Sequence, residues 1–139
     1  MLSQVFGKYQ GIAHSLMRIM VGFTFFTHGG AKLFDWFGGF GEPGSVELLS
    51  RFGVAGILET FGGALIILGL FTRPAAFIVS GEMAVAYFWI HMQRGFWPWT
   101  NRGELPMLYA FVFLFLAAAG SGPISLDALI ARVKKKKAH

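Results

Sequence analysis

The most informative feature of this sequence is the set of ionisable residues that interrupt its apolar stretches. Glu59 is the only charged residue within residues 52–71, a segment otherwise typical of a membrane-spanning helix. The other interrupting residues are Arg18, His28, Glu82 and His91. A charged side chain at the centre of a bilayer costs roughly 2.5–3.5 kcal/mol on insertion scales, so it is rarely there without a partner or a function.

A carboxylate and a histidine inside an apolar pocket can exchange protons with a bound molecule. A metal site from His28, His91, Glu59 and Glu104 is chemically feasible, but their spacing matches no ligand motif, and we predict no metal. The chain has no cysteine, which excludes disulfides, thiolate metal sites and CxxC redox pairs.

Composition indicates a membrane protein with one domain, residues 1–139. Hydrophobic residues make up 55% of the chain and charged residues 14%, well below the roughly 25% charged residues of a soluble domain. Sixteen Phe and nineteen Gly fit close helix packing in lipid. The basic run at residues 134–137 is more typical of the cytosolic flank of a membrane helix than of a nucleic-acid site.

Four apolar segments predict an all-α protein, an integral membrane four-helix bundle with a short C-terminal helix. A membrane helix needs about 20 mainly apolar residues. The expected helices cover about 12–34, 52–71, 74–93 and 105–119, and a short helix with a basic tail covers 125–139. Residues 37–44 predict a glycine-rich loop, and Ser125 is a candidate helix cap. Trp97 and Trp99 indicate a membrane interface within residues 95–103.

The distribution of Lys and Arg predicts that both termini are cytosolic. One end of the helices would carry Lys8, Arg73, Arg132 and the four lysines of the tail, with Arg18 near it. The opposite end would carry Lys32, Arg51, Arg94 and Arg102. The longer loops, which contain Asp35, Glu42 and Glu47, then face outward.

Depth along each helix predicts which charges can meet. At a rise of 1.5 Å per residue, His28, Glu59 and His91 lie in the outer half, with Glu104 at the rim of the same polar cluster. We therefore expect a His28–Glu59 pair. Arg18 and Glu82 lie nearer the inner side and are expected to form a structural ion pair. His91 follows Glu82 by nine positions, half a turn out of phase in a regular helix, so the two should not share a partner.

Several motifs then point to a family. The segment 59–76 reads ETFGGALIILGLFTRPAA; further motifs are GGAKL at 29–33, HMQRGF at 91–96, GE at 103–104 and GSGPISLD at 120–127. Together, in this order, they resemble the DoxX family of small bacterial membrane proteins. The resemblance implies a multi-pass protein of the bacterial inner membrane with four helices. It maps Glu59, Lys32, Arg73, His91 and Glu104 onto characteristic positions of the family.

The resemblance gives less about chemistry. The family name is shared with a subunit associated with thiosulfate:quinone oxidoreduction, and other relatives are linked to complexes with soluble redox enzymes. Our first hypothesis is a redox-associated inner-membrane subunit that binds a quinone or similar apolar ligand through Glu59, His28, His91, Glu104 and Lys32. The alternatives are a non-enzymatic scaffold or assembly factor and a binding protein for a lipid or small metabolite. The expected partners are the lipid bilayer, a redox enzyme and further copies of the chain, but no nucleic acid.

Overall fold

All regular secondary structure is helical in the part that the computed structural model describes, residues 2–39 and 46–138, and these ranges contain no strand. This confirms the all-α expectation for the described residues. The elements are α1 (Leu2–Gly7), α2 (Gln10–Phe34), η1 (Trp36–Gly38), α3 (Arg51–Leu68), α4 (Thr72–Ala86), η2 (Tyr87–His91), η3 (Met92–Arg94), α5 (Pro98–Asn101), α6 (Glu104–Ala119) and α7 (Leu126–Lys137). Most of the predicted loop, including Glu42, lies outside the described residues.

The ends of the helices follow from local sequence. Ser50 caps α3 by accepting a hydrogen bond from Gly53 N, as serine commonly does at a helix start. The helix expected to reach residue 71 ends at Leu68, because Gly69 adopts the left-handed conformation (φ 64°) that glycine tolerates best. Ser125 caps α7 through Ala128 N, which confirms the predicted cap.

The third apolar segment is longer and less regular than expected. α4, η2 and η3 form one continuous path over Thr72–Arg94, in which η2 is a π-helix and η3 a 3₁₀-helix. By length and composition, this path and α3 can each cross a membrane, whereas the apolar helix α6 is shorter. A π-helical turn changes the rotation between successive residues. Side chains after Tyr87 therefore point in directions that a regular α-helix does not predict.

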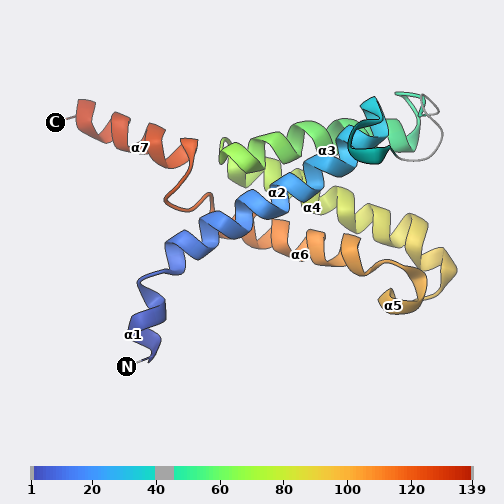
Figure 1. The fold of residues 1–139 in the computed structure, drawn as a ribbon, viewed down its shortest axis with the longest axis horizontal. Coiled ribbons are helices and arrows are strands. Elements are labelled where there is room, and N and C mark those ends of the chain that lie inside the picture. Colours follow the sequence, from blue (N-terminus) through green and yellow to red (C-terminus); the bar gives the residue numbers. More distant parts are fainter. Residues whose placement is uncertain (1, 40–45, 139) are drawn as a thin grey trace.

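The helices pack in a connected series in which α2 lies on α3, α3 on α4, and α4 on α6. Figure 1 shows both chain ends on one side of the view and α5 on the other. Phe25 of α2 is buried and makes edge-on ring contacts with Tyr109 and Phe113 of α6, which complete the core. Outside this core, Phe61, Phe77 and Phe111 expose 66%, 67% and 67% of their surface, as side chains that face lipid do.

Glycines set the distance between α2 and α3. A methyl group added at Gly63 would lie 2.8 Å from both N and Cα of Phe26. One added at Gly29 would collide with the backbone N and the hydroxyl of Thr60. The two backbones therefore touch, which is how small residues allow helices to associate in membranes.

Arg18 connects α2 to the end of α3 and to the segment that follows α6. Its side chain is fully buried and donates hydrogen bonds to four main-chain oxygens, those of Ser121, Ile66, Ile67 and Ile124. The predicted Arg18–Glu82 ion pair is not formed. Carbonyl groups in the last turn of α3 have no N–H donor four residues on within the helix, and they accept hydrogen bonds from the guanidinium in place of a carboxylate.

Asp127 fixes α7 to the turn between α3 and α4. Its carboxylate accepts hydrogen bonds from the backbone N–H groups of Phe71 (2.9 Å) and Thr72 (3.0 Å), and its own N–H donates to Gly69 O (2.8 Å). Partial burial raises the pKa of Asp127, but the hydrogen bonds from Thr72 and Phe71 and the charge of Arg18 outweigh that effect. The pKa therefore lies below its usual value.

The contact between α2 and α3 can be tested with two glycine substitutions. Gly29→Ala should lower the free energy of unfolding by about 1–3 kcal/mol, because the new methyl group overpacks the helix interface. Gly81→Ala is the matched control, since a methyl group at Gly81 meets no atom within 4 Å, and alanine favours a helix over glycine. Thermal unfolding in detergent, followed by circular dichroism, measures both. Equal melting temperatures for the two variants would contradict the close contact.

The Asp127 carboxylate predicts a dependence of stability on pH. A carboxyl group whose pKa is lower in the folded than in the unfolded state stabilises the fold above its unfolded pKa, and that contribution is lost as the pH falls through the folded pKa. We expect Asp127→Asn to lower stability by about 1 kcal/mol at neutral pH. The difference between wild type and variant should shrink below about pH 4. Melting temperatures measured across this range check it, and a constant difference would refute it.

Candidate functional site

A cavity of about 680 Å³ opens between α2, α3, the α4–η3 path and α6. Most of its wall is apolar and comes from side chains of α3, α4 and α6. The titratable residues that line it are His28, Lys32, Arg51, Glu59, Glu82, His91, Arg94, Arg102 and Tyr109. Four of the five residues predicted for the polar cluster therefore lie around one space, which has the size of a typical small-molecule site.

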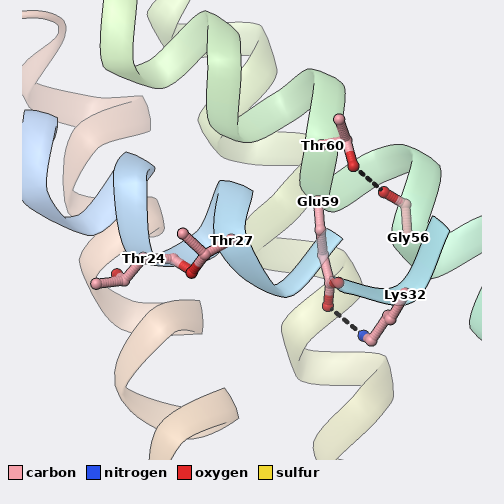
Figure 2. Close-up of polar contacts among 6 residues, drawn as sticks. All are labelled: Thr24, Thr27, Lys32, Gly56, Glu59 and Thr60. Carbon is pink, nitrogen blue, oxygen red and sulfur yellow. Dashed lines mark hydrogen bonds and ion pairs between the residues drawn. The ribbon is translucent and has the colours of Figure 1, made fainter. Parts of the chain in front are cut away.

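Glu59 and Lys32 form an ion pair at the wall of this cavity. Glu59 Oε1 lies 2.7 Å from Lys32 Nζ, and the two side chains expose only 4% and 11% of their surface. Figure 2 shows Lys32 of α2 reaching across to Glu59 of α3, near the bond that Thr60 Oγ1 donates to Gly56 O. The expected partner, His28, lines the same cavity, but Glu59 is bonded to Lys32 instead. The flexible four-carbon stem of lysine lets its ammonium group descend to the buried carboxylate.

Glu82 contributes a second carboxyl group to the cavity, and no described residue forms a hydrogen bond with it. Both of its oxygens are buried and accept no hydrogen bond from any described residue, and the same is true of Glu59 Oε2. Polar atoms that are buried without a partner are rare in proteins, and each calls for an explanation. A ligand in the cavity could supply the missing hydrogen bonds.

His91 lines the same cavity as Glu82, although regular helical geometry put the two half a turn apart. The π-helix Tyr87–His91 lies between them and changes the rotation of the chain. Such turns often occur at functional sites. His91 Nδ1 lies 3.1 Å from Asn101 O, so the ring is tied to the loop that follows η3. Glu104, expected at the rim of the cluster, is exposed and does not line the cavity.

Two residues that sequence reasoning did not select help to build the site. Tyr109 is buried on α6, donates a hydrogen bond to Thr24 Oγ1 (2.8 Å), and packs its ring edge-on against His28. Asn101 is fully buried and bonds to Gly95 O and Gly103 N, both at 2.7 Å, which orders the loop that carries Arg94 and Arg102. A tyrosine near the start of an apolar helix was the available signal for the first; nothing in the sequence indicates the fold of the loop.

The arrangement can bind a largely apolar molecule and exchange protons with it. The walls favour an apolar ligand, and the unpartnered oxygens of Glu59 and Glu82 can accept hydrogen bonds when ionised or hold a proton. Within the described residues, no group of three or more His, Cys, Asp or Glu side chains is placed to hold a metal ion.

Comparison with known proteins places this geometry in a family. The sequence matches the DoxX family model over residues 13–92. An uncharacterised protein of Haemophilus influenzae is 44% identical over 127 residues, which cover 86% of this chain and 92% of that protein. A protein of Bacillus subtilis named "Putative oxidoreductase CatD" is 28% identical over 126 residues, or 86% of this chain and 88% of that protein. No solved structure matches significantly.

The Lys32–Glu59 pair predicts a characteristic pattern of stabilities. Lys32→Met should destabilise the protein by about 3–5 kcal/mol, because it leaves the buried carboxylate without its counter-ion. Adding Glu59→Leu to this variant should restore most of the loss, because an apolar pair of similar volume carries no buried charge. Unfolding of both single variants and the double variant in detergent measures the coupling. Losses that simply add would show that the two side chains do not interact.

Proposed function

Because the chain belongs to the DoxX family of membrane proteins, we propose that it is a redox-associated subunit of the bacterial inner membrane that binds a quinone in the cavity between its helices. Membership follows from the family match over residues 13–92 and from a 44% identical relative that the chain covers almost in full. The redox association is supported by the name of the Bacillus subtilis relative. In this proposal, residues 1–139 form one domain.

In the proposed topology, α2, α3, the α4–η3 path and α6 cross the membrane as a four-helix bundle with both termini in the cytosol. The basic residues at the α1 and α7 end outnumber those at the other end, which favours this orientation. α6 has sixteen residues and spans about 24 Å. Its flanking aromatic residues can accommodate the remaining thickness of the bilayer.

The unpartnered carboxyl group of Glu82 carries the proposal. An apolar wall with a few convergent polar groups is the usual form of a small-molecule site, and a quinone offers carbonyl oxygens at the edge of an apolar ring. When bound, the quinone takes up two electrons and two protons. We assign the electrons to a redox enzyme that docks on the chain, since the chain has no cysteine to carry them.

The residues of the chain then have separate tasks. Glu82 holds a proton at its free carboxyl oxygen and donates it in a hydrogen bond to the ligand. Lys32 keeps Glu59 in place at 2.7 Å, which leaves Glu59 Oε2 facing the cavity as a second point for proton exchange. Tyr109 holds the ring of His28 at the wall. The surrounding apolar side chains exclude water, so a proton reaches the ligand through these groups.

A second function, that of a scaffold for a soluble partner, is supported by α7. In Figure 1 this helix stands apart from the packed helices, and its apolar residues Leu129 and Val133 are exposed beside the lysines at its end. Such a helix can lie on an anionic membrane surface or receive an acidic partner. This role is compatible with quinone binding, because the partner that delivers electrons needs a docking place.

The proposed ligand can be tested by native mass spectrometry of the protein released from mild detergent. Wild type should carry a quinone, and Glu82→Gln should reduce its occupancy about tenfold, because a hydrogen bond to a charged or acidic group is lost. Glu104→Gln is the matched control, since Glu104 lies outside the cavity. Wild type without quinone, or equal occupancy in the Glu82 and Glu104 variants, would refute the proposal.

A further inference from the structure

Three exposed arginines line the cavity. Arg51 is the first residue of α3, Arg94 the last residue of η3, and Arg102 the C-cap of α5, and all three line the cavity. We call them the arginine rim. Arg94 and Arg102 belong to one loop, whereas Arg51 comes from the start of α3, so the fold brings it to the same cavity as the other two.

Among the described residues, no acidic side chain pairs with the arginine rim. Within residues 2–39 and 46–138, no acidic side chain forms an ion pair with any of the three, and none of them has a hydrogen-bond acceptor there. Like charges that share a site repel each other. A guanidinium presents five donors in a planar fork that matches the oxygens of a phosphate. The rim therefore has the charge and geometry to receive an anion.

The position of the rim supports the same conclusion. Basic residues are normally concentrated on the cytosolic side of membrane proteins, yet this end of the helices also carries four, Lys32 and the three of the rim. All four line this cavity. The basic residues at the end opposite α1 and α7 are thus placed around one cavity, where they can bind a ligand.

The backbone at Arg102 is unusual for its residue type. It has φ 61° and ψ 25°, the left-handed conformation in which glycine normally ends a helix. For other residues this conformation costs about 1 kcal/mol or more, and such strain gathers at ligand-binding sites. Hydrogen bonds of Asn101 to Gly95 O and Gly103 N hold the loop in this form. The backbone of Arg102 is thereby held beside the cavity.

Apolar side chains next to the rim determine what kind of anion fits. Leu49 and Trp89 line the cavity and expose 91% and 65% of their surface, and Val85 and Leu105 are also exposed. A small inorganic anion would use the arginines and leave this surface bare. An anion with a long apolar tail would cover both.

We propose that the arginine rim binds the phosphate of an acidic phospholipid, whose acyl chains lie along the apolar surface formed by Leu49, Val85, Trp89 and Leu105. The ends of α3, η3 and α5 place the rim at the depth of lipid headgroups, and the stacked pair Trp97 and Trp99 (centroids 5.1 Å apart) marks the same interface. Basic pockets between membrane helices recognise acidic headgroups in this manner. The site does not require that the deeper part of the cavity bind a quinone.

The test uses lipid nanodiscs made from phosphatidylglycerol and phosphatidylcholine with the same acyl chains. The protein is released into mild detergent, and the lipids that stay bound are quantified by mass spectrometry. Wild type should retain phosphatidylglycerol in excess of its share in the nanodisc. The triple variant Arg51→Gln, Arg94→Gln, Arg102→Gln should lose this enrichment, on the order of fivefold for each arginine removed.

The control variant Lys135→Gln, Lys136→Gln, Lys137→Gln removes the same number of charges from α7, outside the cavity. It measures the loss that net charge alone produces, and it should keep most of the enrichment. Equal loss in both triple variants would reduce the effect to net charge and overturn the proposal, as would no enrichment in wild type. If the triple arginine variant unfolds, the single variants Arg51→Gln, Arg94→Gln and Arg102→Gln are each compared with Lys136→Gln in the same way.

A separate arm measures stabilisation by inorganic phosphate alone. Melting shifts with phosphate as large as those with phosphatidylglycerol would assign the rim to a free oxyanion and overturn the lipid assignment. Quinone is quantified in the same extracts. Loss of phosphatidylglycerol with unchanged quinone in the arginine variant separates this site from the proposed function, and the Glu82→Gln variant should show the reverse.

Discussion

The direct contact between the backbones of α2 and α3 is the constraint on which the site depends. Gly29 and Gly63 leave no room for a side chain between these helices. Lys32 follows Gly29 by one turn of α2, and Glu59 directly precedes Thr60, the residue that Gly29 touches. The glycine contact therefore sets both the distance and the register at which the lysine meets the carboxylate. Without it, Glu59 would be a buried charge with no counter-ion.

The same constraint explains which parts of the site could be predicted from the sequence. Depth along each helix predicted that His28, Glu59 and His91 lie at similar levels, because depth follows from the rise per residue, and all three residues line the cavity. Depth did not identify Lys32 as the partner of Glu59. A histidine is rigid and its depth follows from its position, whereas the long stem of a lysine lets its charge reach a level far from its own backbone. Whether it does so depends on how closely the helices pack.

The other differences have equally local causes. The Arg18–Glu82 pair was predicted from charge and depth, but main-chain oxygens of Ile66 and Ile67 at the end of α3 compete for the guanidinium, and a sequence does not reveal which carbonyl groups remain unsatisfied. The phase between Glu82 and His91 was calculated for a regular helix, and the π-helix Tyr87–His91 changes it. The four long helices themselves were visible in the sequence, because long apolar stretches separated by Gly and Pro are a strong signal.

Several features that lower the stability of the fold occur together at the cavity. Among the described residues, the buried carboxyl oxygens of Glu82 accept no hydrogen bond, and no acidic side chain pairs with Arg51, Arg94 or Arg102. Both sets line a cavity of about 680 Å³. Each feature lowers the stability of the empty protein, through desolvation, repulsion or lost packing. Proteins usually break the rules of folding at the sites where they function. Carboxyl groups at depth and guanidinium groups at the exposed end also give the cavity a direction. A ligand at the carboxyl end meets hydrogen-bonding groups, whereas a ligand at the guanidinium end meets positive charge, so the two ends of the cavity suit different chemistry.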